Sequence, residues 1–81
     1  MKAWTVTYSR RYTDNGQIET GIKFAPTTYR EARKEFAWLK QHYMFHGYKM
    51  TRFSSTEYGF ANKYVTEVME LVRDDITNYA I

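Results

Sequence analysis

The chain contains no cysteine, so it forms no disulfide bond and offers no thiolate to a metal ion. No apolar run approaches the ~20 residues of a membrane span, and the first residues begin a strand-like pattern where a signal peptide would be apolar. With one proline and four glycines, the sequence shows no linker, repeat or low-complexity stretch. We therefore expect a single domain over residues 1–81, no membrane contact, and a cytoplasmic location, which is the host cytoplasm if a phage encodes the protein.

Aromatic residues, in contrast, are abundant at 19%, with eight Tyr, five Phe and two Trp. A chain of 81 residues hides only about 60–65% of its extended surface on folding, so its core must be economical. Each aromatic side chain removes roughly 150–250 Å² from water. The aromatic content therefore fits a small core, with some aromatic surface left exposed.

The first part of the chain predicts a β-hairpin. Residues 3–12 alternate between two faces, and the inward face is expected to hold Trp4, Val6, Tyr8 and Tyr12. Residues 14–16, Asp-Asn-Gly, tolerate positive φ and suit the turn. In the second strand, the inward residues are expected to be Ile18, Thr20, Ile22 and Phe24.

A helix is predicted from Tyr29 to about Phe45. Pro26 stops the preceding strand, because it has no N–H to give to a sheet, and Thr28 with Glu31 forms a capping box. The helix stripe that faces the sheet is expected to be Ala32, Phe36, Leu39 and Tyr43. Gly47 stands where a helix commonly ends in a left-handed residue.

The remaining residues predict a strand and a second helix. Residues 48–54 suggest a strand with a bulge or twist near Arg52, and residues 57–61 are either a fourth strand or an irregular connection. Asn62 can cap a final helix, and early termination best explains the acidic Asp74 and Asp75 at its end, although a basic partner surface is the alternative. The apolar face of this helix is expected to be Tyr64, Val65, Val68, Leu71, Val72 and Ile76.

These elements indicate an α+β fold: a small antiparallel sheet of three or four strands with an N-terminal hairpin, and two helices packed on one face. The expected order is ββαβ(β)α.

Charge is unevenly distributed, with a net +6 on residues 1–63 and −3 on residues 64–81, which together give the overall +3. Such an asymmetric surface steers partners of opposite charge. One group of cations lies near the open end of the hairpin: Arg10, Arg11 and Lys23. The other follows the first helix: Arg30, Arg33, Lys34 and Lys40. A solvated helix face with intrahelical ion pairs is the simpler account of the second group.

No pattern of reactive residues points to an enzyme. His42 and His46, four apart on a helix, provide half of a zinc site, and no spacing supplies the other ligands. The serines lie in strand or turn positions without a nucleophile elbow, and residues 25–28 are not a glycine-rich phosphate loop. We therefore expect neither catalysis, nor a metal, nor a cofactor.

Binding is the remaining class of function. Nucleic-acid binding is one candidate, in which aromatic rings stack on unpaired bases of RNA or single-stranded DNA and cations attract phosphates. Its parts would be Tyr8, Tyr12, Tyr48 and Tyr58 with Arg10, Arg11 and Arg52. Protein binding is the other candidate, because Trp, Tyr, Arg and Met are typical of interface hot spots. The helix carries such residues outside its buried stripe, namely Tyr29, Trp38, Met44 and Phe45, and Trp38 is either packed under the last helix or exposed as an anchor.

The chain resembles small proteins that phages and mobile elements encode to disable host defences, including anti-CRISPR proteins. The resemblance rests on the compact length, the absent cysteine, the hairpin at Asp14-Asn15-Gly16 leading into the helix of Arg30 to Lys40, and the lack of catalytic motifs. It implies a non-enzymatic inhibitor that occludes a host protein or nucleoprotein complex. The expected partner-binding residues are Arg10, Arg11, Arg30, Arg33, Lys34, Trp38, Lys40 and Arg52. A homodimer formed through a sheet edge is a further expectation.

Overall fold

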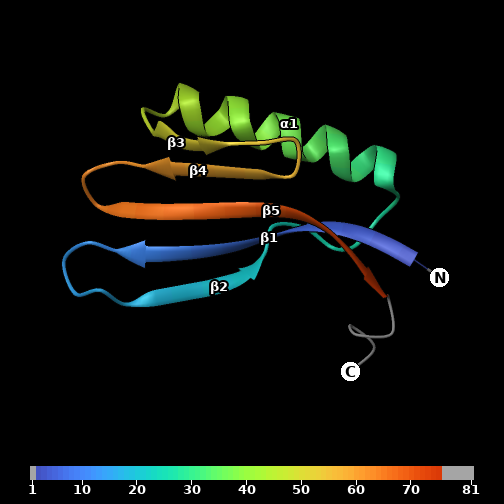
Figure 1. Ribbon diagram of the computed structural model, residues 1–81, viewed down its shortest axis with the longest axis horizontal. Helices are drawn as coiled ribbons and strands as arrows, with labels where there is room; N and C mark the ends of the chain where they lie inside the picture. Colours follow the sequence, from blue (N-terminus) through green and yellow to red (C-terminus); the bar gives the residue numbers. More distant parts are fainter. Residues whose placement is uncertain (1, 76–81) are drawn as a thin grey trace.

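The computed structural model describes residues 2–75, which form one five-stranded antiparallel sheet with a helix on one face (Figure 1). The elements are β1 (Lys2–Tyr12), β2 (Ile18–Ile22), α1 (Tyr29–Phe45), β3 (Lys49–Phe53), β4 (Glu57–Ala61) and β5 (Val65–Asp75). The strand order β2-β1-β5-β4-β3 places the first and last strands side by side in the sheet interior. An α+β fold with an antiparallel sheet and an N-terminal hairpin is confirmed. No helix in the described range is long and apolar enough to cross a membrane.

The hairpin and the helix occur where the local sequence predicts them. Gly16 in the β1–β2 turn has φ 69° and Gly47 after α1 has φ 85°, the left-handed conformation that glycine adopts without steric cost. The Thr28 hydroxyl accepts a hydrogen bond from the Glu31 N–H at 3.2 Å and so caps α1. The buried residues of α1 are the predicted stripe: Ala32, Phe36, Leu39 and Tyr43.

Residues 57–61, which the sequence leaves as strand or irregular connection, form the strand β4. The predicted irregularity near Arg52 is a register shift between Met50 and Arg52 in the pairing of β3 with β4. The shift lets Met50 pack against the core and Phe53 stack on Tyr58, although the two residues differ in parity.

The predicted second helix is wrong. Residues 65–75 form the strand β5, paired with β1 on one side and β4 on the other, so the sheet has five strands rather than three or four and the order is ββαβββ. As an interior strand, β5 carries apolar residues on both faces, among them Val68 and Val72 on the face away from α1. Apolar residues on both faces of the strand produce a spacing that resembles that of an amphipathic helix. The strand alternation itself, with Val65, Met69 and Leu71 toward α1, is hard to recognise because the charged Glu67 interrupts it. Ile76 of the predicted apolar face lies outside the described residues.

Asn62 shows how one local signal serves two structures. Its side-chain oxygen accepts the N–H groups of Tyr64 at 2.8 Å and Val65 at 2.9 Å, as a helix N-cap would. The Asn62 N–H, however, donates to the Val65 carbonyl at 3.0 Å, which closes the turn between β4 and β5.

The predicted inward face of β2 is also wrong. Ile18, Thr20 and Ile22 pair with Arg11, Ser9 and Thr7 of β1, on the face that points away from α1. Ile18 is accordingly 62% exposed and Ile22 39% exposed. Only Phe24, beyond the strand, packs against the core. Alternation alone fixes which residues of a strand share a face but not which face is covered.

The core lies between α1 and the facing sides of β1, β4 and β5. Its buried members are Val6, Ala32, Phe36, Leu39, Tyr43, Tyr58, Phe60, Met69 and Leu71. Phe36 is 1% exposed and its ring stacks on Tyr58 with 4.0 Å between centroids. This contact anchors the middle of α1 to the sheet.

We expect Phe36→Ala to lower the free energy of unfolding by about 3–5 kcal/mol, because it empties a fully buried ring position. Phe45→Ala is the matched control: the same substitution on the same helix removes a ring that is 86% exposed, and it should change stability by less than about 0.5 kcal/mol. Urea denaturation followed by circular dichroism measures both. Equal losses for the two variants would contradict the placement of the core.

Candidate functional site

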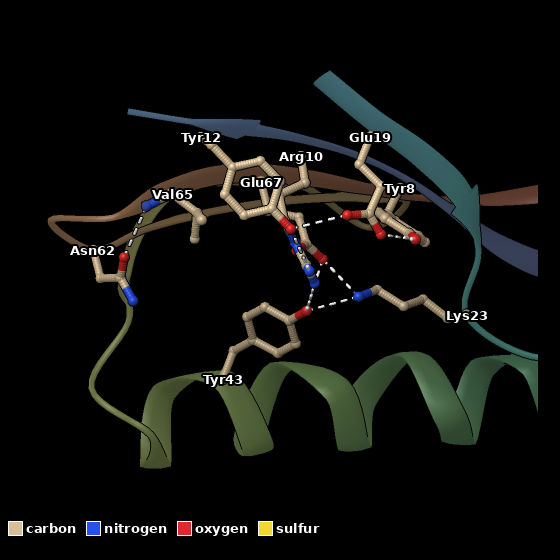
Figure 2. Close-up of polar contacts among 9 residues, drawn as sticks. All are labelled: Tyr8, Arg10, Tyr12, Glu19, Lys23, Tyr43, Asn62, Val65 and Glu67. Atoms are coloured by element: carbon tan, nitrogen blue, oxygen red, sulfur yellow. Dashed lines mark hydrogen bonds and ion pairs between the residues drawn. The ribbon is translucent and has the colours of Figure 1, made fainter. Parts of the chain in front are cut away.

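A buried carboxylate, Glu67 of β5, is the centre of a polar cluster between the sheet and α1 (Figure 2). Glu67 is 0% exposed, and two cations contact it: Arg10 Nε lies 2.6 Å from Oε1, and Lys23 Nζ lies 2.7 Å from Oε2. The Tyr43 hydroxyl of α1 donates to the same Oε2 at 2.7 Å and accepts from Lys23 Nζ at 2.6 Å. The cluster therefore joins β1, β5, α1 and the segment after β2.

A second carboxylate extends this cluster toward β2. Glu19 accepts the hydroxyl of Tyr8 on Oε2 and the hydroxyl of Tyr12 on Oε1, each at 2.9 Å. The Tyr12 hydroxyl in turn accepts from Arg10 at 3.4 Å. Lys23 Nζ also lies 4.3 Å from the centre of the Tyr8 ring, a cation–π distance. Two cations and two carboxylates thus balance each other.

The hydrogen bonds of the cluster move the pKa values of Glu67, Tyr43 and Glu19 further from neutral pH. Burial alone would raise the pKa of Glu67, but hydrogen bonds from Lys23, Tyr43 and Arg10 outweigh it and lower that pKa. Burial raises the pKa of Tyr43, and its hydrogen bond to Glu67 raises it further. Hydrogen bonds from Tyr12 and Tyr8 lower the pKa of Glu19. General acid–base catalysis works best with a pKa near the working pH, so these shifts favour fixed ion pairs over proton transfer.

The solvent side of α1 presents a different kind of surface. Arg30, Lys34, Trp38 and His42 follow one another at steps of four, which makes them neighbours along the helix, and all four are exposed. The Trp38 ring is 56% exposed and stacks on His42 with 4.7 Å between centroids. An open hollow beside this row is lined by Trp38, Gln41, His42, Met44 and Phe45. We call these five residues the α1 aromatic surface.

The predicted cations of the helix are not equivalent. Arg33 donates to the Ser55 carbonyl at 2.7 Å, and Lys40 lies 5.1 Å from the centre of the Phe53 ring, so both side chains are directed to the sheet side of α1. Arg30 and Lys34 are exposed and form no ion pair with any side chain among residues 3–73. Arg30, Lys34 and Trp38 are therefore the predicted site residues that share one surface.

The other predicted cations are separated by the sheet. Arg10 lies on the face toward α1 and is engaged with Glu67, whereas Arg11 lies on the opposite face. Arg52 shares that opposite face and forms an ion pair with Glu57 at 2.9 Å. The hairpin patch that the sequence suggests is thus divided between the two sides of the sheet.

The tyrosines considered for base stacking also occupy the layer between sheet and helix. Tyr58 is buried at 6% exposure, and Tyr8 and Tyr48 pack against the core. The Tyr12 hydroxyl is held by Glu19 and Arg10. These rings are therefore engaged in the fold: Tyr58 is buried, and Tyr8, Tyr12 and Tyr48 are partly buried.

The two helix histidines lie close together, with 4.4 Å between the ring centroids of His42 and His46. Among the side chains of the described residues, no group of three or more His, Asp or Glu converges as a metal site requires. The pair therefore contributes to the aromatic character of α1.

Sequence reasoning missed Glu67, Lys23 and Tyr43 as members of one cluster. The available signal was parity: Arg10 falls on the inward face of an otherwise apolar strand, and such a cation needs a carboxylate partner. Its partner is 57 positions away along the chain, so it could be identified only from the β1–β5 register.

Searches against protein-family models, curated proteins and solved structures find no match to this chain.

We expect Glu67→Gln to lower the free energy of unfolding by about 3–5 kcal/mol at pH 7, because it leaves Arg10 and Lys23 beside a neutral amide. The control is Glu57→Gln, which removes a partly exposed pair with Arg52 and should cost less than about 1 kcal/mol. Urea denaturation at pH 7 measures both variants.

The same pair of proteins should respond differently to acid. The folded pKa of Glu67 is below its unfolded value of about 4.3, so its ionisation stabilises the fold above that pH, and this contribution is lost as the pH falls through the folded pKa. The gap in unfolding free energy between the wild type and Glu67→Gln should therefore narrow below about pH 4. A gap that stays constant down to pH 2.5 would show that Glu67 is not the ionised centre of the cluster.

Proposed function

We propose that this protein acts by binding, as a small non-enzymatic inhibitor that covers a surface of a host protein or nucleoprotein complex. The observation that carries the proposal is the α1 aromatic surface, where Trp38, Met44 and Phe45 are 56%, 50% and 86% exposed on one helix. Large apolar side chains exposed together mark interaction sites more often than isolated ones do. Trp and Met are also enriched at interface centres, where burial in a pocket of the partner contributes most of the affinity.

The chemistry of the partner follows from the row of residues beside this surface. Arg30 and Lys34 precede Trp38 at steps of four and form no ion pair with the side chains of residues 3–73. Exposed cations next to an apolar anchor fit a protein partner that has an apolar pocket flanked by carboxylates. Such a partner would gain both a buried contact and electrostatic steering.

The polar cluster supports a binding role rather than a reactive one. The cluster consists of Glu67, Arg10, Lys23 and Tyr43, which contact each other. The lowered pKa of Glu67 favours the charged carboxylate, and the raised pKa of Tyr43 favours the neutral phenol. The cluster holds α1 on the sheet and so presents the aromatic surface on a rigid body. Rigid presentation reduces the entropy lost on binding. Occlusion by such a body is also what the resemblance to anti-CRISPR proteins implies.

We expect Trp38→Ala to weaken partner binding at least tenfold, because it removes the central anchor of the surface. The protein, tagged outside α1, is used to capture proteins from the cells that naturally carry its gene, and the captured protein is then purified for titration. Tyr64→Ala is the matched control: it removes an aromatic ring that is 63% exposed, from the β4–β5 turn and not from α1. A partner that binds the wild type and both variants equally would contradict the proposal.

The salt dependence separates a protein partner from a nucleic acid. Labelled RNA and single-stranded DNA are titrated with the wild type at physiological salt. Micromolar binding that falls steeply with salt, through counterion release, and that is insensitive to Trp38→Ala would support nucleic-acid binding instead. For the inhibitory role, an excess of the wild type should stop the activity of the captured protein or complex, and the same excess of Trp38→Ala should not.

A further inference from the structure

The two edges of the sheet differ in how well they are protected against pairing with another strand. The β3 edge carries a bulge at Met50/Arg52 and the cations Lys49 and Arg52, which are features that block the addition of a strand. The β2 edge has none of these features: its register with β1 is unbroken from Ile18 to Ile22, and all five residues are exposed. It contains neither proline nor lysine.

The backbone groups of β2 that point outward can be identified from its pairing with β1. The Tyr12 N–H donates to the Gln17 carbonyl at 3.0 Å, and the Lys23 N–H donates to the Val6 carbonyl at 2.8 Å. Hydrogen bonding alternates along an antiparallel pair, so Glu19 and Gly21 also bond to β1. The N–H and C=O groups of Ile18, Thr20 and Ile22 therefore point away from the sheet, at its edge.

The two charged side chains on or just after β2 do not guard this edge, because both are engaged by neighbouring side chains on the α1 face of the sheet. Glu19, the one charged residue of β2, accepts hydrogen bonds from Tyr8 and Tyr12 of β1. Lys23, just after the strand, is bound to Glu67 and Tyr43 (Figure 2). What remains at the edge is the sequence Ile-Glu-Thr-Gly-Ile, with its isoleucines 62% and 39% exposed.

The two isoleucines of this segment are placed symmetrically about Thr20, and a second copy of the chain is the partner that this spacing fits. We propose that two copies pair β2 with β2 in an antiparallel arrangement, with a two-fold axis at Thr20. Thr20 then faces Thr20 of the second copy, and Ile18 faces Ile22 of the second copy. The three outward-pointing residues of each strand form the new hydrogen-bonded pairs, and the isoleucines cover each other on the face away from α1.

The register also avoids repulsion between the two copies. Glu19 lies opposite Gly21 of the second copy, so the two carboxylates are offset along the strands and stay bound to their own tyrosines. The two sheets become one continuous sheet with both α1 helices on the same side, because paired residues point to the same face. The dimer would present two α1 aromatic surfaces on the same side, although it does not depend on the binding role proposed for them.

Single cysteines test the register, since the native chain has none. In a hydrogen-bonded antiparallel pair the Cα atoms are about 5.5 Å apart, within the range of a disulfide. Thr20→Cys should therefore cross-link with itself under mild oxidation. Ile18→Cys is the matched control on the same edge: its two copies are offset by about 13 Å along the strands and should not cross-link, whereas the double variant Ile18→Cys/Ile22→Cys should.

Sedimentation equilibrium of the cysteine-free protein tests the association itself. A pairing of two five-residue edges is small, so we expect a concentration-dependent dimer. Ile18→Lys should raise the dissociation constant at least tenfold, because it places a cation against Ile22 of the second copy at the edge. Thr66→Lys adds the same charge to the same face on the interior strand β5 and should leave the dissociation constant within about twofold.

A protein that remains monomeric up to about 1 mM would overturn the proposal, as would cross-linking of Ile18→Cys at the same rate as Thr20→Cys. Trp38→Ala should leave dimerisation unchanged. The failure of dimerisation and the failure of partner binding by α1 are therefore separate results.

Discussion

The fold depends on one buried charge. Glu67 is fully enclosed between the sheet and α1, where an unpaired carboxylate would be too costly to keep ionised. Arg10 reaches it from the facing position of β1, Lys23 from the segment after β2, and Tyr43 from α1. A slip of one residue between β1 and β5 would turn Arg10 to the opposite face and leave the carboxylate unpaired. The charge therefore fixes the register between β1 and β5 as well as the position of the helix.

This requirement decides which side chains remain for contacts with other molecules. Arg10 and Lys23 form ion pairs with Glu67, and Glu19 accepts hydrogen bonds from two tyrosines. These three charged groups are therefore already engaged within the fold. The exposed cations of α1, Arg30 and Lys34, lie instead in line with Trp38. The same contacts hold the charged groups of Glu19 and Lys23 on the α1 face of the sheet, beside the β2 edge. The buried network thus bears on both proposed surfaces: it holds α1 on the sheet, and its extension to Glu19 and Lys23 engages the charged groups beside the β2 edge.

The two surfaces are also independent of each other in space. The aromatic surface belongs to a helix that packs on β1, β4 and β5 through its buried stripe, whereas β2 forms the edge farthest from α1 in Figure 1. The isoleucines of β2 point to the face away from the helix. A second copy paired at this edge would therefore leave both helices accessible, and a partner with two equivalent sites would bind the dimer with increased avidity.

Local patterns in the chain predicted the elements whose causes are local: the first hairpin, the helix with its cap and buried stripe, and the irregularity near Arg52. These depend on turn residues, capping groups and periodicity within a short window. Tertiary structure decided that residues 65–75 form a strand, that Ile18 and Ile22 face solvent, and that the predicted cations divide between two sides of the sheet. Each of these outcomes depends on which strands become neighbours. The carboxylate that Arg10 needs lies 57 positions along the chain, where no local pattern can identify it.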